Sequence, residues 1–399
     1  MLLLRLRKPL ALWIALLAVA AEAGAQVPLD PERYPELVSR LNDVTRGEDT
    51  VPCDLLTYAP HLSFDFRFQG GYSLYVRLKH YSGAGDSIRV VTRITPQNPA
   101  ASPVYLTQTL DLPDVPRKNR AELQLAGGYF VGEGKYGFDL MMLDSEGRVC
   151  RKHWQAEAKR SGGNREIPLQ IAPGTVAPFS FAAWKAMFDQ DRKSASHPQR
   201  LTILFHVAPL FRRNMNLRNY DQEMLLGSLA SLLEQIPSSE VKLVAFNLDQ
   251  QKELFRQENF DGSGWDRLLE AMDKLQLGTV SYETLAHRAG HVDLLNKLVD
   301  EELAGPSRSK AVIFLGPTAR QSDKLQAAPH RVADTSQPLF FYFEYKPYWF
   351  RGIDFPDVVY HLTRALSGQA FRIHSPNEFA SAIKAVRESL DEKSVQGTE

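Results

Sequence analysis

The hydrophobic pattern of the chain changes near residue 200, and this change constrains the fold more than any other feature. From residue 51 to 158, short segments such as HLSFDFRF, YSLYVRLKHY and SIRVVTRI alternate apolar and polar residues between Gly, Pro, Asn and Asp turns. Alternation with a period of two is typical of half-buried strands. Short strands at regular spacing predict an antiparallel β-sandwich over 51–158.

After residue 200, apolar strands take turns with amphipathic helices. We predict strands at LTILFHVA, EVKLVAF, KELF, KAVIFLG and PLFFYFEY, and helices at YDQEMLLGSLASLLEQI and YETLAHRAGHVDLLNKLVDEEL. This alternation predicts a Rossmann-like, mostly parallel sheet with helices on both faces over 200–392. The predicted fold class is therefore α/β plus all-β, and residues 393–399 form a tail.

The first residues, MLLLRLRKPLALWIALLAVAAEAGAQ, have the layout of a secretory signal peptide. A basic start precedes an apolar run over 10–21, and the small residues Ala23, Gly24 and Ala25 form the cleavage site. The run is short for a transmembrane helix. We expect cleavage of residues 1–25, no transmembrane segment afterwards, and a secreted, periplasmic or cell-envelope location. Retention of the segment as an anchor is the alternative.

The chain contains only two cysteines, Cys53 and Cys150. In an oxidising compartment, an even number of cysteines favours a disulfide. Chain-entropy models value a loop of this size at about 4–5 kcal/mol. The alternative is a pair of buried thiols.

Two less regular segments flank the predicted sandwich. Residues 26–50 contain one short amphipathic helix, with Tyr34, Leu37, Val38 and Leu41 on one face. Residues 159–199 are rich in Gly and Pro and are expected to be a linker region with local structure.

The overall charge is balanced, with 47 basic and 47 acidic residues and a pI near 7.2. Such a chain has no general electrostatic attraction to nucleic acid or to anionic membranes. We therefore expect no nucleic-acid partner.

Gly132, Gly134 and Gly137 match the spacing of a dinucleotide-binding turn. That motif requires a following helix, whose N-terminus holds the pyrophosphate. The next residues, FDLMMLD, have a strand pattern instead. We expect a hairpin between GGYFV and FDLMML, and no nucleotide cofactor.

Two other motifs fall short of a catalytic or metal site. His287 and His291 are four residues apart, but Arg288 stands where a zinc protease needs glutamate. We expect two partly exposed helix histidines. Ser263 lies between glycines, but Asp261 breaks the nucleophile-elbow pattern, so Ser263 is expected to cap a helix. We predict no catalytic residue, cofactor or metal ion.

The order of elements from Leu201 to about Leu390 resembles a von Willebrand factor A (VWFA) domain of the secreted bacterial type. The resemblance implies a metal-ion-dependent adhesion site with a D-x-S-x-S motif after the first strand. Here those positions are His206, Ala208 and Leu210. Thr279 resembles the threonine of that site, and the expected aspartate falls near Pro317. One hydroxyl cannot hold magnesium or calcium, which take several oxygen ligands, so the predicted site is degenerate and metal-free.

These features predict a non-catalytic protein-interaction protein of adhesion or scaffold type with an unknown protein partner. Ligands of open α/β sheets bind at the C-terminal ends of the strands. The candidate docking residues there are Leu210, Phe211, Arg212 and Arg213. The alternatives are that Leu210 and Phe211 pack in the core, that the aromatic segment 345–350 binds the partner, or that both domains serve only envelope assembly. A further alternative is a hydrolase or other enzyme using the strand ends near His206, Thr279 and Thr318.

Overall fold

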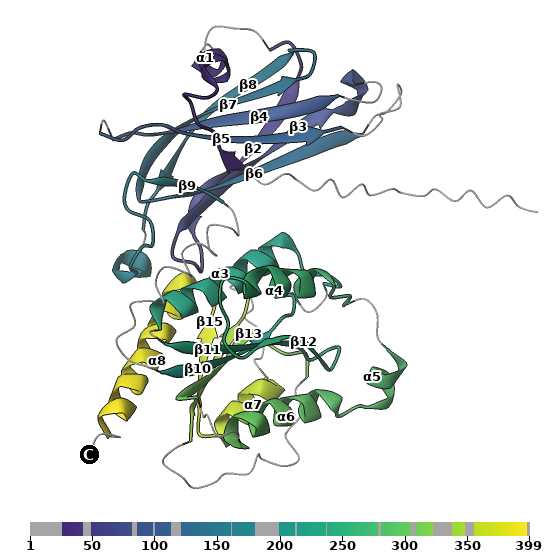
Figure 1. Cartoon of the computed structure of the whole chain (residues 1–399), viewed down its shortest axis with the longest axis vertical. Helices are drawn as coiled ribbons and strands as arrows, with labels where there is room; N and C mark the ends of the chain where they lie inside the picture. Colours follow the sequence, from purple (N-terminus) through teal and green to yellow (C-terminus); the bar gives the residue numbers. More distant parts are fainter. Residues whose placement is uncertain are drawn as a thin grey trace, which may run out of the picture.

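The computed structural model of the chain describes residues 26–42, 49–81, 86–98, 100–112, 121–160, 162–179, 199–211, 214–236, 238–277, 281–304, 309–321, 337–347 and 355–396. Within these residues the chain forms three β-sheets (Figure 1). Two antiparallel sheets make a sandwich, and a six-stranded sheet carries helices on both faces. The predicted class of α/β plus β structure is confirmed at this level.

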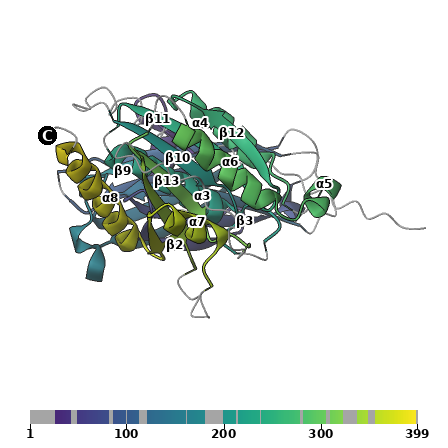
Figure 2. The same cartoon turned by 90° about the horizontal axis from the view of Figure 1, so that it is seen from below.

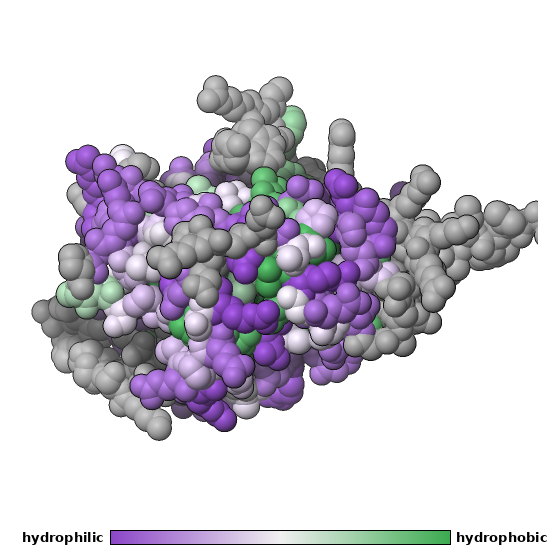
Figure 3. Space-filling model, turned by 90° about the horizontal axis from the view of Figure 1, so that it is seen from above, coloured by the Kyte–Doolittle hydropathy of each residue, from purple (hydrophilic) through white to green (hydrophobic). Residues whose placement is uncertain are grey.

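The sandwich consists of a five-stranded sheet, in the order β1-β5-β4-β7-β8, and a four-stranded sheet, in the order β2-β3-β6-β9. Its elements are β1 (Val27–Pro28), α1 (Pro35–Asn42), β2 (Cys53–Leu62), β3 (Phe68–Arg77), η2 (Leu78–His80), β4 (Ser87–Pro96), β5 (Val104–Asp111), β6 (Glu122–Val131), β7 (Gly134–Asp144), β8 (Val149–Ala158) and β9 (Val176–Pro178). The end of the molecule formed by the sandwich is largely hydrophilic, with small hydrophobic areas between the polar groups (Figure 3).

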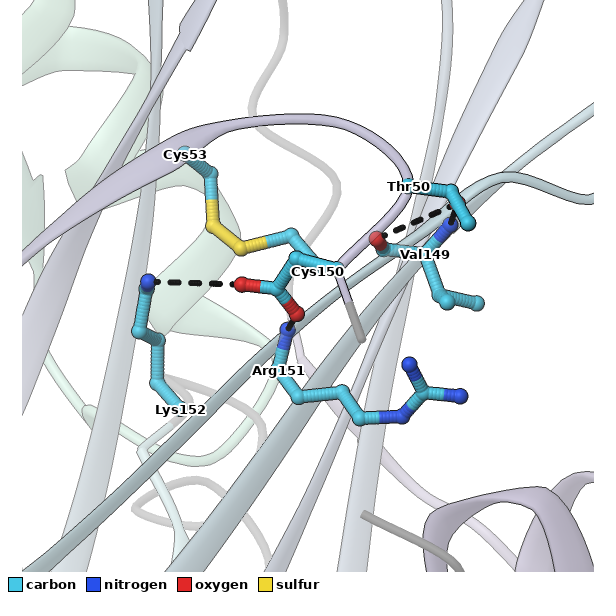
Figure 4. Close-up of a disulfide and its surroundings, with 7 residues drawn as sticks. Thr50, Cys53, Val149, Cys150, Arg151 and Lys152 are labelled. Atoms are coloured by element: carbon cyan, nitrogen blue, oxygen red, sulfur yellow. Dashed lines mark hydrogen bonds and ion pairs between the residues drawn. A yellow bond between two sulfur atoms is a disulfide. The ribbon is translucent and has the colours of Figure 1, made fainter. Parts of the chain in front are cut away.

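The predicted disulfide between Cys53 and Cys150 is present and joins β2 to β8, one strand from each sheet (Figure 4). Both cysteines are buried in the apolar core between the sheets. Alternating residues of the strands, such as Leu74, Val90 and Leu140, fill this core. The alternation seen in the sequence therefore corresponds to the two faces of each strand.

The hairpin predicted around the three glycines is wrong. Strand β6 pairs with β3 and β9, whereas β7 pairs with β4 and β8, so the chain crosses from one sheet to the other at residues 132–133. A Cβ at Gly132 would meet the carbonyl oxygen of Ala172 at 1.8 Å, and Gly134 has φ +152°. Glycine is used here because the crossover needs close backbone packing and a left-handed turn.

The six-stranded sheet has the order β12-β11-β10-β13-β14-β15, and its only antiparallel pair among the described strands is β11–β12. Its strands are β10 (Arg200–His206), β11 (Glu240–Asn247), β12 (Lys252–Gln257), β13 (Ala311–Pro317), β14 (Leu339–Tyr345) and β15 (Gln369–Ile373). The central strands are apolar and almost fully buried, as expected for a sheet that helices cover on both faces.

Helices cover both faces of this sheet (Figure 1), and Figure 2 views it from the side of α6 and α7. Those on the sandwich side are α3 (Asn219–Gln235), α4 (Gly264–Asp273) and α8 (Pro376–Gln396); those on the far side are α6 (Gly290–Ala304) and α7 (Val358–Ala365). The short helix α5 (Tyr282–Ala286) projects beside them. None of the described helices is long and apolar enough to cross a membrane.

The long helix predicted over YETLAHRAGHVDLLNKLVDEEL is divided into α5 and α6. A Cβ at Gly290, where α6 begins, would meet the Gln251 side chain at 2.1 Å. The two histidines therefore do not share one helix face. His287 is exposed beside Asp293, at 3.0 Å, and His291 is buried.

The tip of the β2–β3 hairpin (residues 63–67) inserts into the α/β half of the molecule. The Phe64 ring meets Tyr345 edge-on, with centroids 5.2 Å apart, and Phe66 lies 5.7 Å from the Phe379 ring of α8. Phe66 is 1% exposed and belongs to the same core as Phe343 of β14. The hairpin tip thus fills the sheet face between α3 and α8.

An ionic cluster accompanies these rings. The Arg67 guanidinium lies 3.4 Å from Asp65 and 3.2 Å from Glu234 of α3, and all three side chains are less than a tenth exposed. Nearby, the Gln69 amide donates to Glu223 at 2.9 Å, and burial raises the pKa of the Glu223 carboxyl. The sandwich and the α/β half therefore share a packed and hydrogen-bonded contact.

Part of the predicted linker is ordered into this contact. Residues 162–166 form η3 (Gly162–Glu166), and β9 adds a strand to the sandwich. Ile167 and Ile171, between them, belong to the core shared with α8. The Gly and Pro content of the segment gave no sign of these buried residues.

Candidate functional site

The segments that follow β10, β11, β13 and β14 meet at the C-terminal edge of the parallel sheet. This edge is the position predicted for a ligand site, because parallel strands end together there. The side chains that converge on it are mainly polar and mainly buried. Their hydrogen bonds determine what chemistry the edge can support.

His206, the last residue of β10, is 5% exposed. Its Nδ1 lies 3.2 Å from the Pro317 carbonyl oxygen, and its ring stacks on Phe246. A Cβ on Gly316 would come within 2.7 Å of the histidine Cβ, so glycine makes room for this residue. Within the described residues, Nε2 has no hydrogen-bond partner. Burial lowers the pKa of His206, so the imidazole is held in its neutral form.

Arg320 ties three segments of the edge together. Its Nε lies 3.0 Å from the Asp249 carboxylate in the segment after β11, and its Nη2 donates to the Asn214 carbonyl oxygen in the segment after β10, at 3.1 Å. The Gln321 amide also donates to Asp249, at 3.0 Å. The Arg320 guanidinium therefore links the segments that follow β10, β11 and β13.

Asp357 performs a similar task on the other side of the edge. It caps α7 by accepting from the Tyr360 amide at 2.8 Å. Its second oxygen accepts from the Ala319 amide at 2.6 Å and from the Tyr342 hydroxyl at 2.8 Å. A single buried carboxylate thus joins α7, β14 and the segment after β13.

The remaining buried acid is Glu344, at the end of β14. It accepts from the Thr318 hydroxyl at 2.9 Å and pairs with Lys346 at 3.1 Å. Burial, together with the nearby Asp357 charge, raises the pKa of Glu344. Thr318 and Lys346 therefore both hold the Glu344 carboxylate in place.

The alternative enzymatic site predicted from the sequence consists of His206, Thr279 and Thr318. The Thr318 hydroxyl donates to the Glu344 carboxylate at 2.9 Å, whereas His206 Nδ1 lies beside the Pro317 carbonyl oxygen. Thr279, the third member of the alternative enzymatic site, lies outside the described residues. In the part of the chain that the structure describes, no group of three or more His, Cys, Asp or Glu side chains could hold a metal ion.

Ser263 stands at the N-cap position of α4, as predicted, but its hydroxyl donates to Asp261 at 2.6 Å and accepts no hydrogen bond from a backbone amide of the helix. Asp261 also accepts from the Ser263 amide, at 3.1 Å. The aspartate that breaks the nucleophile pattern therefore anchors the start of this helix.

Large apolar side chains are exposed around the same edge. Tyr282 and Leu285, on α5, are 85% and 64% exposed, and Phe355, before α7, is 67% exposed. Helix α5 belongs to this edge because the Gln251 side chain, after β11, donates to the His287 carbonyl oxygen at 2.9 Å. We use "apolar rim" for the exposed set Met215, Tyr220, Tyr282, Leu285 and Phe355.

The two apolar residues predicted for docking, Leu210 and Phe211, are not exposed at the edge of the sheet. Leu210 is buried in the core, where its amide donates to Asp221 at 2.9 Å, and Ala208 is also buried. Phe211 is partly buried against the same core. Arg212 and Arg213 lie outside the described residues. The alternative reading, in which Leu210 packs inward, is the one that the structure has.

The aromatic segment 345–350 is described only at its start. Tyr345 is 1% exposed and packs against Phe64 of the hairpin tip, so this residue is not available to a partner. Residues 348–350 lie outside the described part of the chain.

Sequence reasoning missed both Asp357 and the apolar rim. Asp357 follows Phe-Pro and precedes an apolar run, which is the pattern of a helix N-cap and could have identified it. Tyr282 and Leu285 fall within the single long helix that the sequence predicted, and a helical pattern alone does not show which of its side chains stay exposed.

Comparison with known proteins does not assign the chain to a family. No family model matches the chain, and no curated protein matches it. Among solved structures, Northeast Structural Genomics Consortium target SoR45 is 13% identical over 29% of this chain and 98% of that chain, with a TM-score of 0.18. A calcium-binding mutant of Bacteroides uniformis beta-glucuronidase 2 is 8% identical over 79% of this chain and 38% of that chain, also with a TM-score of 0.18.

Proposed function

We propose that this is an exported, non-catalytic protein that binds another protein through the apolar rim, and that its α/β half is a metal-free, VWFA-like domain. The strand order β12-β11-β10-β13-β14-β15, with a single antiparallel edge strand, supports this arrangement. The disulfide is compatible with an oxidising compartment outside the cytoplasm.

The observation that carries the proposal is the exposure of Tyr282, Leu285 and Phe355 at one edge of the sheet. Exposing an aromatic or aliphatic side chain forgoes about 1.5–3 kcal/mol relative to burial. Exposed apolar groups with tyrosine among them are characteristic of protein-binding surfaces. The buried polar cluster behind them holds the strand ends in place and leaves the outer side chains to make contacts.

The test is to replace Tyr282 and Leu285 with alanine together. A photo-crosslinker at position 355 and a pull-down from the protein's own envelope fraction then report on the partner. We expect the double change to reduce partner recovery by about tenfold or more, because hot-spot side chains carry most of the binding energy. The free energy of unfolding should change by less than about 0.5 kcal/mol, since both residues are exposed.

The matched control is Leu56→Ala with Tyr58→Ala, a second exposed pair, on β2 of the sandwich. This pair is 50% and 46% exposed and should leave recovery unchanged. Equal loss for both double changes, or loss only for the sandwich pair, would contradict docking at the apolar rim. A recovered partner that no crosslink places at position 355 would do the same.

A further inference from the structure

The edge strands of the sandwich, as far as the structure describes them, are β1, β2, β8 and β9. Strands β1 and β9 are two and three residues long, and each ends in a proline, Pro28 or Pro178. Strand β2 is longer, but its pairing with β3 shifts register between Tyr58 and His61, where Pro60 lies. Proline has no amide hydrogen to donate, and short strands, prolines and bulges all hinder pairing with another chain.

Strand β8 has none of these protective features in its described length. It runs for ten residues without a proline, and its pairing with β7 continues without a register shift from Val149 to Ala158. A long, regular edge of this kind is a template for a further strand.

The contacts of the first residues of β8 show which backbone groups face away from β7. The Val149 amide donates to the Thr50 hydroxyl at 2.7 Å, and the Arg151 amide donates to Asp49 at 2.7 Å. Neither acceptor belongs to β7. Because the N–H and C=O groups of successive residues point to opposite sides of a strand, every second residue from 149 onward presents its backbone to the outer edge.

The same alternation brings the backbone groups of His153, Gln155 and Glu157 to the outer edge. All three residues are exposed, and among the residues that the structure describes nothing accepts from or donates to these outward backbone groups. The residues between them, Trp154 and Ala156, face the core of the sandwich and are partly buried. Five residues of β8 are therefore open to a further strand.

We propose that β8 pairs with β8 of a second copy of this chain, in antiparallel orientation and centred on Gln155. His153 then lies opposite Glu157 of the second copy, and Gln155 lies opposite its own counterpart. Each opposed pair exchanges two backbone hydrogen bonds, and the two five-stranded sheets become one continuous sheet. The apolar rim takes no part in this contact.

The side chains favour this register. The His153 ring, whose Nδ1 lies 2.8 Å from Asp139, is placed beside a second carboxylate, that of Glu157, and a protonated imidazole donates from both nitrogens. The two-fold axis makes this pair twice. A register centred on Glu157 would set two carboxylates opposite each other, which is destabilising. One centred on His153 would require the edge at Arg151, which Asp49 occupies.

The core-facing side of the strand is also complementary to itself. The Trp154 indole stacks on Phe138, with centroids 4.8 Å apart, at the border of the core. In this register Trp154 lies opposite the small Ala156 of the second copy, so the large ring is covered without a clash. Because only five residues pair, the contact is small, and such contacts are weak and depend on protein concentration.

The test is analytical ultracentrifugation of the purified mature protein over a range of concentrations, where we expect a monomer–dimer equilibrium. Gln155→Pro removes an amide that faces outward, so it should weaken the dimer by about tenfold or more while the pairing with β7 is kept. The matched control Gln155→Ala keeps the amide and should associate like the wild type. A chain that stays monomeric at millimolar concentration, or a dimer that Gln155→Pro leaves unchanged, would overturn the proposal.

The register is tested with single cysteines and a short bifunctional thiol reagent. The two native cysteines are joined to each other, so an introduced surface thiol reacts alone. Gln155→Cys should crosslink to its counterpart, because opposed residues lie about 5.5 Å apart. Glu157→Cys should not, since its counterpart is four residues away along the strand, or about 14 Å. Equal crosslinking of both variants, or of Glu157→Cys alone, would overturn the pairing, and this result does not depend on whether Gln155→Pro folds.

Discussion

The hairpin tip and the apolar rim both carry large apolar side chains, which are buried at the tip and exposed at the rim. At the hairpin tip, Phe66 is 1% exposed and an ionic cluster of Arg67, Asp65 and Glu234 is enclosed with it. At the rim, Tyr282 is 85% exposed and Phe355 67%. The α/β half can therefore bury aromatic groups that arrive from elsewhere in the chain.

The difference in burial suggests different roles for the hairpin tip and the apolar rim. The hairpin tip contributes to stability, because its rings and charges are removed from water and paired. The rim contributes little to stability, because most of its apolar area stays in water. If this interpretation is right, changes at the hairpin tip should affect folding, and changes at the rim should affect binding.

The largest effect is expected for Phe66→Ala. Truncating a buried phenylalanine leaves a cavity, which costs about 4 kcal/mol of unfolding free energy. The exposed counterpart Phe355→Ala should cost less than about 0.5 kcal/mol. Urea denaturation of the two variants measures the contrast. Similar losses for both variants would remove the distinction between the two regions.

A somewhat smaller effect is expected for Arg67→Ala. Removing the guanidinium takes an ion-pair partner from the buried carboxylates of Asp65 and Glu234, and breaking a buried ion pair costs about 3 kcal/mol. The control is Arg77→Ala, because Arg77 forms an exposed pair with Glu122 and should contribute at most about 1 kcal/mol. If Arg67→Ala is as mild as this control, the cluster is not what stabilises the contact.

The smallest effect belongs to His206, at the edge of the sheet behind the rim. Burial lowers its pKa in the folded state, so the unfolded chain binds a proton more readily. The stability from this residue is thus present above the unfolded pKa of about 6.5 and is lost as pH falls below it. One such group changes the unfolding free energy by at most about 1.4 kcal/mol per pH unit.

His206→Gln should accordingly flatten the dependence of unfolding free energy on pH between about 5 and 6.5. Glu344 acts in the opposite sense: its raised pKa gives stability that is present below its unfolded pKa and is lost as pH rises through the folded one. Denaturation curves of the wild type and the variant across this range provide the measurement. Parallel pH profiles would show that His206 is not the titrating group.

The hydrophobic period predicted which half of the chain forms a sandwich and which forms an α/β sheet. It could not place the hairpin tip, because HLSFDFRF alternates like any half-buried strand. In the structure, β2 ends at Leu62 and β3 begins at Phe68, and the two phenylalanines between them leave the sandwich altogether. Periodicity shows that a side chain is buried and does not identify the surface that buries it.

The edge of the sheet shows a second limit of the sequence. The position of His206 at the end of a strand was predicted correctly, since the apolar run of β10 ends there. Its neighbours Asp249, Arg320 and Asp357 come from three separate segments, and only the strand order brings them together. The division of α5 from α6 is likewise a tertiary effect, because Gly290 is required by the Gln251 side chain.

The hairpin tip also bears on the order in which the chain matures. Phe64 and Phe66 lie in the turn between β2 and β3, in the first part of the chain, whereas Phe379, whose ring contacts both of them, lies on the last helix. Because the chain is synthesised from its N-terminus, the rings of Phe64 and Phe66 stay exposed to solvent until α8 has been made. Contacts between residues so far apart in sequence form late in folding, and the intermediates that precede them expose apolar surface and are prone to aggregate. A chain interrupted before α8 would therefore present an aromatic hairpin to solvent, and such fragments are natural substrates for chaperones and proteases.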